Sequence, residues 1–185
     1  DTPVFQVKAY NSGYNLISWE KVSGATGYYV YRKPAAGGKW SQIADVGTSE
    51  LKYKDSKVTA NASYRYTVKA YYEASGKRYS GKYKTGDVIK AAPAVQKVTS
   101  VKSEKNGIRI RRKPQKKCDG YYIYRKKKGG SYQLIKKISN GNSSSYLDKK
   151  AQKGVSYYYA VKAYVKEPYG NTYSKYKSSS AVKRK

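Results

Sequence analysis

The 185-residue sequence has no histidine, no methionine and one cysteine, and its 40 Lys and Arg residues face only 11 Asp and Glu. The lack of histidine removes the most common general base and metal ligand. One cysteine excludes an internal disulfide and a cysteine-built metal site. No glycine-rich phosphate loop is present, and no spacing of acids indicates a catalytic pair. We therefore expect no enzyme activity, no cofactor and no metal.

Long apolar runs are also missing. No stretch of 18 apolar residues is present, so we expect no membrane span. The first residues are not basic and then apolar, so any export signal is expected to be cleaved or to lie outside this sequence. Because no anchor follows the last residues either, we expect the chain to come from a longer parent protein with other domains.

Tyrosine and positive charge are abundant. Tyr occurs 24 times against one Phe, so a core must use Tyr rings whose hydroxyls reach the surface or a polar partner. The net charge of +29 favours an anionic partner. The regular spacing of Tyr, Val and Ile argues against disorder.

An internal repeat organises the chain. The string GYYVYRK at residues 27–33 returns 93 positions later as GYYIYRK at residues 120–126, and residues 64–71 match residues 157–164 at the same offset. Two copies of a unit of about 90 residues are expected, at residues 1–92 and 93–185. The short, proline-containing segment 90–94 joins them.

Each copy has the pattern of a β-sandwich. Aromatic and β-branched runs of period two alternate with Gly- and Asn-containing turns. In the first copy, strands are predicted near residues 4–9, 14–19, 27–33, 39–46, 51–54, 63–72 and 79–90. Seven short strands indicate an all-β fold of two tandem immunoglobulin-like sandwiches.

Three segments of the first copy carry a family resemblance. LISW (16–19), GYYVYR (27–32) and YKD (53–55) resemble strands B, C and E of a fibronectin type III domain. The second copy repeats the pattern, in the Lys- and Tyr-rich style of repeats in secreted and surface proteins of Gram-positive bacteria. The resemblance implies an extracellular or cell-wall location, with Tyr64 and Tyr157 as tyrosine corners.

The second copy departs from this pattern at two positions. Arg112 stands where the first copy has Trp19, and a buried unpaired Arg is costly. We expect its stem to pack at an edge with the head in water, or the strand to shift register locally. Cys118 stands where the first copy has Ala25, which favours a small structural residue.

Alternation along the strands predicts an exposed, outward face that is both aromatic and cationic. The candidate binding residues on it are Tyr29, Tyr31, Arg65, Lys69 and Tyr71 in the first copy and Tyr122, Tyr124, Tyr158, Lys162 and Tyr164 in the second. The next strand is expected to extend the face with Trp40 and Tyr132.

Three functions are compatible with this pattern. The first is a module that binds anionic cell-wall or extracellular polymers, such as teichoic acid or acidic polysaccharide. The second is a passive spacer between other domains, and the third is an adhesin for neutral glycans or host proteins. Residues 1–92 carry 15 basic against 7 acidic residues (+8) and residues 93–185 carry 25 against 4 (+21), which favours the first. Non-specific binding to nucleic acid at low salt is also expected.

Overall fold

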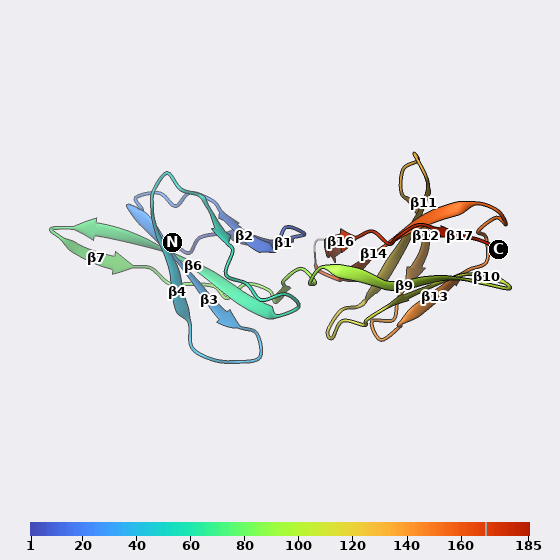
Figure 1. The fold of residues 1–185 in the computed structure, drawn as a ribbon. Coiled ribbons are helices and arrows are strands. Elements are labelled where there is room, and N and C mark those ends of the chain that lie inside the picture. The colour runs from blue at the N-terminus through green and yellow to red at the C-terminus, as the bar shows by residue number, and fades with distance from the viewer. Residues whose placement is uncertain (169) are drawn as a thin grey trace. The chain divides into compact units, whose positions relative to one another are not determined.

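The computed structural model describes residues 1–168 and 170–185. The chain divides into two compact units, Asp1–Ala91 (unit 1) and Ala92–Lys185 (unit 2). The repeat predicted a division one residue later. Among the described residues, every regular element is a β-strand (Figure 1).

Unit 1 is a sandwich of two antiparallel sheets. One has the order β1-β2-β5, and the other has the order β4-β3-β6-β7, with β8 pairing to the start of β6. The strands are β1 (Phe5–Tyr10), β2 (Tyr14–Trp19), β3 (Gly27–Pro34), β4 (Ser41–Gly47), β5 (Lys52–Asp55), β6 (Ser63–Ala74), β7 (Lys77–Ser80) and β8 (Ile89–Lys90). The all-β sandwich is confirmed.

The last strand predicted for unit 1 is interrupted. Only its two ends form regular strand, as β7 and β8. Between them, the amides of Gly81 and Gly86 still donate to carbonyls of β6, at 3.0 Å each. Glycine weakens a strand because it brings no side chain to pack.

Unit 2 repeats the sandwich, with one change at its edge. Its sheets have the orders β13-β10-β9-β16 and β12-β11-β14-β15, with β17 pairing to β14. The short strand β16 pairs in parallel with β9 and so joins the other sheet. The strands are β9 (Gln96–Glu104), β10 (Gly107–Arg112), β11 (Gly120–Lys127), β12 (Gln133–Ile138), β13 (Ser145–Asp148), β14 (Ser156–Val165), β15 (Thr172–Tyr173), β16 (Tyr176–Lys177) and β17 (Val182–Lys183).

Tyrosine rings supply much of the volume of both cores. The largest fully buried side chains are Tyr28, Tyr66, Tyr121, Tyr157 and Tyr159. Each hydroxyl has a hydrogen-bond partner; that of Tyr28, for example, accepts from the Val22 amide at 2.9 Å. Paired hydroxyls remove the cost of burying a polar group, which is why tyrosine can replace phenylalanine here.

Both predicted tyrosine corners are present. The hydroxyl of Tyr64 accepts a hydrogen bond from the Thr59 amide at 2.9 Å, and that of Tyr157 accepts from the Gln152 amide at 3.2 Å. Each bond ties the start of the long strand β6 or β14 to the loop before it.

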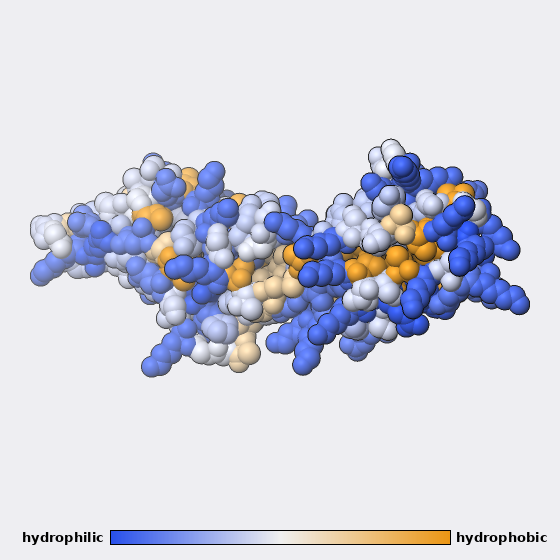
Figure 2. All heavy atoms as spheres, in the orientation of Figure 1, coloured by the Kyte–Doolittle hydropathy of each residue, from blue (hydrophilic) through white to orange (hydrophobic). Residues whose placement is uncertain are grey.

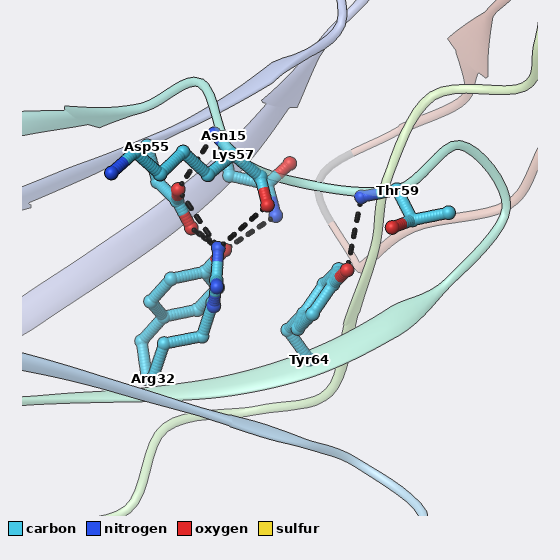
Figure 3. Close-up of polar contacts among 7 residues, drawn as sticks. Asn15, Arg32, Asp55, Lys57, Thr59 and Tyr64 are labelled. Atoms are coloured by element: carbon cyan, nitrogen blue, oxygen red, sulfur yellow. Dashed lines mark hydrogen bonds and ion pairs between the residues drawn. The ribbon is translucent and has the colours of Figure 1, made fainter. Parts of the chain in front are cut away.

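A buried carboxylate joins the two sheets of unit 1 (Figure 3). Asp55, at the end of β5, is 2% exposed and accepts from Arg32 Nη1 at 2.9 Å and from Tyr66 Oη at 2.8 Å. Arg32 and Tyr66 belong to the opposite sheet. Burial raises the pKa of Tyr66, and the Asp55 charge raises it further, so its hydroxyl stays a donor.

Unit 2 repeats this inter-sheet bridge. Asp148 is 1% exposed and accepts from Arg125 Nη1 at 2.9 Å and from Tyr159 Oη at 2.8 Å. Asn15, which donates to Tyr66 Oη in unit 1, is replaced at the same register by the apolar Ile108. The carboxylate, arginine and tyrosine are therefore the repeated parts of the bridge.

Arg112 lies inside unit 2. We expected its guanidinium head to lie in water, and this expectation is wrong. The residue is 3% exposed, and its guanidinium carbon lies 4.0 Å from the centroid of the Tyr121 ring. The alternative, a shift in register, is observed between Arg111 and Arg112. The bulge lets the side chain take the place that Trp19 takes against Tyr28 in unit 1.

Removing the bridge carboxylate should destabilise its own unit. Asp55→Ala leaves Arg32 and Tyr66 without their shared acceptor and is expected to lower the free energy of unfolding of unit 1 by about 2–4 kcal/mol. Hydrogen exchange of the β6 amides measures the loss. The control Asp45→Ala, which removes one acid from an exposed ion pair, should have a much smaller effect. Equal effects would contradict a structural role for the bridge.

Arg112 should lower the stability of unit 2. In Arg112→Met the buried charge is lost while an apolar stem remains, so the free energy of unfolding of unit 2 is expected to rise by about 1–3 kcal/mol, even though a cation–π contact is lost. The exchange rates of the β14 amides report the change. The matched variant Trp19→Met should lower the stability of unit 1, because it removes core volume. A loss of stability in Arg112→Met would contradict this account.

Candidate functional site

The predicted binding residues lie on one side of one sheet in each unit. We call this side, which faces away from the core, the outer face: it belongs to β4, β3, β6 and β7 in unit 1 and to β12, β11, β14 and β15 in unit 2. The register places Tyr29 opposite Lys69 and Tyr122 opposite Lys162. The strands that carry GYYVYRK and GYYIYRK are thus neighbours of β6 and β14, as predicted.

A lysine lies between two tyrosine rings at the centre of each outer face. Lys69 Nζ is 5.7 Å from the centroid of the Tyr31 ring and 4.8 Å from that of Tyr83. In unit 2, Lys162 Nζ is 5.5 Å from the centroids of both Tyr124 and Tyr176. These are cation–π distances, so the rings hold the ammonium group in place without neutralising it.

Trp40 and Tyr132 extend the outer faces, although neither lies on a strand. Each is the residue just before β4 or β12. Trp40 packs edge-on against Tyr83, with ring centroids 6.1 Å apart, and lies under Lys33. Tyr132 packs in the same way against Tyr176 at 5.7 Å and lies under Lys126.

The repeated positions 65 and 158 differ in what they contact. Arg65 donates from Nη1 to the Gly86 carbonyl at 3.0 Å, so its head holds the final segment of unit 1. Tyr158 is half-buried, and the Lys126 ammonium lies 5.5 Å from its ring centroid. Unit 2 therefore adds a ring to the face where unit 1 has a structural arginine.

The expectation that Tyr71 and Tyr164 are exposed is wrong. They point outward but are only 6% and 4% exposed. Each ring lies directly on a glycine, Gly27 or Gly120, where a Cβ would collide with it. Neighbouring side chains then cover the ring.

The covering side chains differ between the units. In unit 1, the Tyr29 ring packs at a tilt against Tyr71 with centroids 4.6 Å apart, and the guanidinium carbon of Arg78 lies 4.6 Å from the Tyr71 centroid. In unit 2, Tyr122 and Tyr173 lie against Tyr164. Tyr71 and Tyr164 therefore lie beneath the outermost side chains of the outer face and support them.

Only unit 1 has acidic residues on the strands of this sheet. Arg78 pairs with Asp45 at 2.6 Å and with Glu73 at 2.7 Å. Its hydrogen bond to the Tyr29 hydroxyl and these two ion pairs raise the pKa of Arg78. In unit 2, strands β11, β12 and β14 contain no Asp or Glu. Lys126, Lys137 and Lys162 contact tyrosine rings instead, so the outer face of unit 2 keeps its positive charge.

The hydroxyl of Tyr122 lies in a cluster of polar groups. Hydrogen bonds from Tyr173 and Asn171 and the charge of Lys137 lower the pKa of Tyr122, although partial burial opposes the shift. The Lys137 ammonium is 5.3 Å from the centroid of the Tyr122 ring. Burial and the neighbouring Tyr122 hydroxyl raise the pKa of Tyr173.

Several residues of the outer faces were missed by the sequence reasoning. These are Lys33, Arg78 and Tyr83 in unit 1 and Lys126, Lys137, Tyr173 and Tyr176 in unit 2. The repeat could have identified two pairs of them. Tyr83 and Tyr176 are 93 positions apart, and so are Lys33 and Lys126. Arg78, Lys137 and Tyr173 do not recur at that offset.

The described part of the chain offers no cluster of three or more acidic, cysteine or histidine side chains that could hold a metal ion. Within residues 1–168 and 170–185 there is also no helix that could cross a membrane. Figure 2 shows hydrophilic residues over most of the surface in view, with hydrophobic residues in small patches.

Comparison with solved structures identifies the fold. The FN1–FN3 domains of chicken CNTN1 match with a TM-score of 0.50 and 21% identity, over 100% of this chain and 68% of that chain. A segment of two fibronectin type III domains from chicken tenascin matches with a TM-score of 0.47 and 15% identity, over 99% of each chain. No family model and no curated protein matches. The first likeness supports a tandem fold of the fibronectin type III kind.

The Tyr122 cluster should be visible in a titration. With tyrosine ring carbons labelled for NMR, Tyr122 is expected to ionise below the ordinary tyrosine pKa of about 10, whereas Tyr173 and Tyr124 should ionise above it. In Lys137→Gln the pKa of Tyr122 should rise, because a nearby positive charge has been removed. The exposed Lys136→Gln serves as the control. A Tyr122 pKa that is unchanged in Lys137→Gln would contradict the assigned contact.

Proposed function

We propose that this chain is a non-catalytic tandem module of an extracellular or cell-wall protein, which binds anionic polymers through its outer faces. The observation that supports this most strongly is the outer face of unit 2, where lysines lie over tyrosine rings and the three main strands have no acidic residue. The polymer would be a polyphosphate such as teichoic acid, or an acidic polysaccharide.

The contacts of the lysines explain why this face attracts anions. Lys126, Lys137 and Lys162 each lie about 5 Å from a tyrosine ring centroid. A cation–π contact at an exposed site contributes about 0.5–1 kcal/mol, enough to orient the side chain while the charge remains. An ordered ammonium group also loses less side-chain entropy when an anion binds.

Three of the four acids of unit 2 are engaged in other contacts. Asp148 is buried in the inter-sheet bridge, Glu104 pairs with Arg109 at 3.0 Å, and Asp119 accepts from the Lys166 amide at 2.8 Å. Unit 1 instead uses Asp45 and Glu73 to neutralise Arg78 on its outer face. Unit 2 therefore provides the main electrostatic attraction, and the smaller net charge of unit 1 is consistent with a secondary role.

The tyrosines add contacts that do not depend on salt. Tyr29 and Tyr31 in unit 1 and Tyr122 and Tyr124 in unit 2 are half-buried, with ring area open at the outer face. Aromatic rings can pack against the apolar faces of polymer units. Two copies on one chain would increase apparent affinity for a repetitive polymer, since the second contact becomes intramolecular.

The lysines of the outer face should carry the salt-sensitive part of binding. The variant Lys126→Gln/Lys137→Gln/Lys162→Gln is expected to bind teichoic acid about tenfold or more weakly at about 50 mM salt, because three ionic contacts are lost. The control Lys102→Gln/Lys105→Gln/Arg111→Gln removes the same charge from strands β9 and β10 of the other sheet and the turn between them. Equal losses in the two variants would show that net charge, and not this face, determines binding.

The tyrosines can be tested separately. Replacement of Tyr29, Tyr31, Tyr122 and Tyr124 by Ser should weaken retention on cell walls, with the fold checked by circular dichroism. Retention is compared at about 50 and 500 mM salt, on walls with and without teichoic acid. Binding that survives high salt and stripping would indicate a neutral glycan instead. No binding to any wall would leave the chain as a spacer.

A further inference from the structure

Two departures from the repeat meet at one place in unit 2. Arg112 replaces Trp19, and Cys118, the only cysteine of the chain, replaces Ala25. Both lie against Tyr121: the Arg112 guanidinium covers its ring, and the Cys118 sulfur is 3.8 Å from the Gly141 carbonyl oxygen to which Tyr121 Oη donates at 2.9 Å. We call Arg112, Cys118 and Tyr121 the Cys118 cluster.

The guanidinium in this cluster has no counter-charge. Arg112 is 97% buried, since 3% of it is exposed, and its Nε, Nη1 and Nη2 atoms have no hydrogen-bond partner among the described residues. An arginine does not give up its proton in a protein, so the charge stays and its burial is costly. In the described part of unit 2, no ion pair joins an acidic residue to Arg112.

Tyr121 does not supply the missing anion. Burial is the main cause that raises the pKa of Tyr121 to about 12, and the contact with Cys118 adds to it. The phenol is therefore neutral at ordinary pH. Burial lowers the pKa of Arg112, whereas negative charge on Tyr121 or Cys118 would raise it. Cys118 and the Arg112 guanidinium both lie against Tyr121, so a negative charge on Cys118 would act on the guanidinium.

We propose that Cys118 is a redox modification site, at which a peroxide oxidises the thiol to a sulfinate that pairs with Arg112. The first step forms an S–O bond as the O–O bond of hydrogen peroxide breaks, and it yields a sulfenic acid and water. A second peroxide adds another oxygen in the same way and yields a sulfinic acid and water. The sulfinic acid releases its proton to solvent. Sulfur is oxidised and peroxide oxygen is reduced in both steps.

The loop presents this thiol in a fixed position. Lys117, directly before Cys118, has a φ of +62°, a left-handed conformation that a non-glycine residue adopts only where its surroundings hold it. Opposite, any Cβ at Gly141 would collide with the Cys118 carbonyl, so the two loops are closely packed. Cys118 remains partly exposed, which gives a small peroxide access.

The composition of the chain makes the reaction easy to follow. With no methionine and one cysteine, a mass gain of two oxygen atoms after peroxide treatment can be assigned by peptide mapping to Cys118. In the oxidised wild-type chain, exchange of the β14 amides is expected to be about tenfold or more slower than in the reduced chain, as one charge-assisted hydrogen bond would give. Cys118→Ala is the control for effects of peroxide on other residues.

The variant Arg112→Met distinguishes the effect of the sulfinate–Arg112 ion pair from the effect of oxidation itself. In this variant the same oxidation should not slow exchange, because the sulfinate has no cation to meet. Equal slowing in wild type and Arg112→Met would overturn the proposal. So would a Cys118 that resists peroxide in the folded chain but reacts in denaturant.

A carboxylate can stand in for the sulfinate if oxidation disrupts the fold. Cys118→Asp and Cys118→Asn have nearly the same shape and differ in charge. With Arg112 present, the Asp variant should exchange its β14 amides more slowly than the Asn variant, and the difference should vanish in Arg112→Met. Faster exchange in the Asp variant would show that the cluster does not accept an anion.

Discussion

A carboxylate buried between two sheets is the interaction on which each unit depends. Asp55 and Asp148 end a strand of one sheet and bind an arginine and a tyrosine of the other. Arg32 must point inward to reach Asp55, which determines the side of the sheet on which each residue of β3 lies. Tyr31, the residue before Arg32, must therefore point outward. The same contact that closes the sandwich therefore orients the outer face.

The two units have the same inter-sheet bridge but differ in net charge. Unit 2 has few acids and places one of them, Asp148, inside the fold, so repulsion among its cations is not relieved on the outer face. It also contains the buried cation of Arg112. Cations without neutralising partners repel one another and lower the free energy of unfolding of the unit. Such a loss of stability is expected where a surface functions by binding an anion.

Period-two patterns predicted most of the strands and the side of the sheet on which their residues lie, because alternation reports these directly. The tyrosine corners followed from the family resemblance. The sequence did not predict that Tyr71 is covered, since alternation gives a side chain's direction and says nothing of the residues above it. It also missed Tyr83 and Tyr176, which come from irregular or very short segments. For Arg112 a register shift was one of the two expectations and is observed, but the burial of its guanidinium head was not predicted.

The most direct test of the central claim is a lysine footprint. Surface amines of the intact chain are labelled with and without teichoic acid at about 50 mM salt, and the labelled peptides are quantified. If the outer face of unit 2 binds the polymer, Lys126, Lys137 and Lys162 should be protected, while Lys102 and Lys105 on the other sheet remain reactive. Uniform protection, or protection of Lys102 and Lys105 alone, would contradict the account.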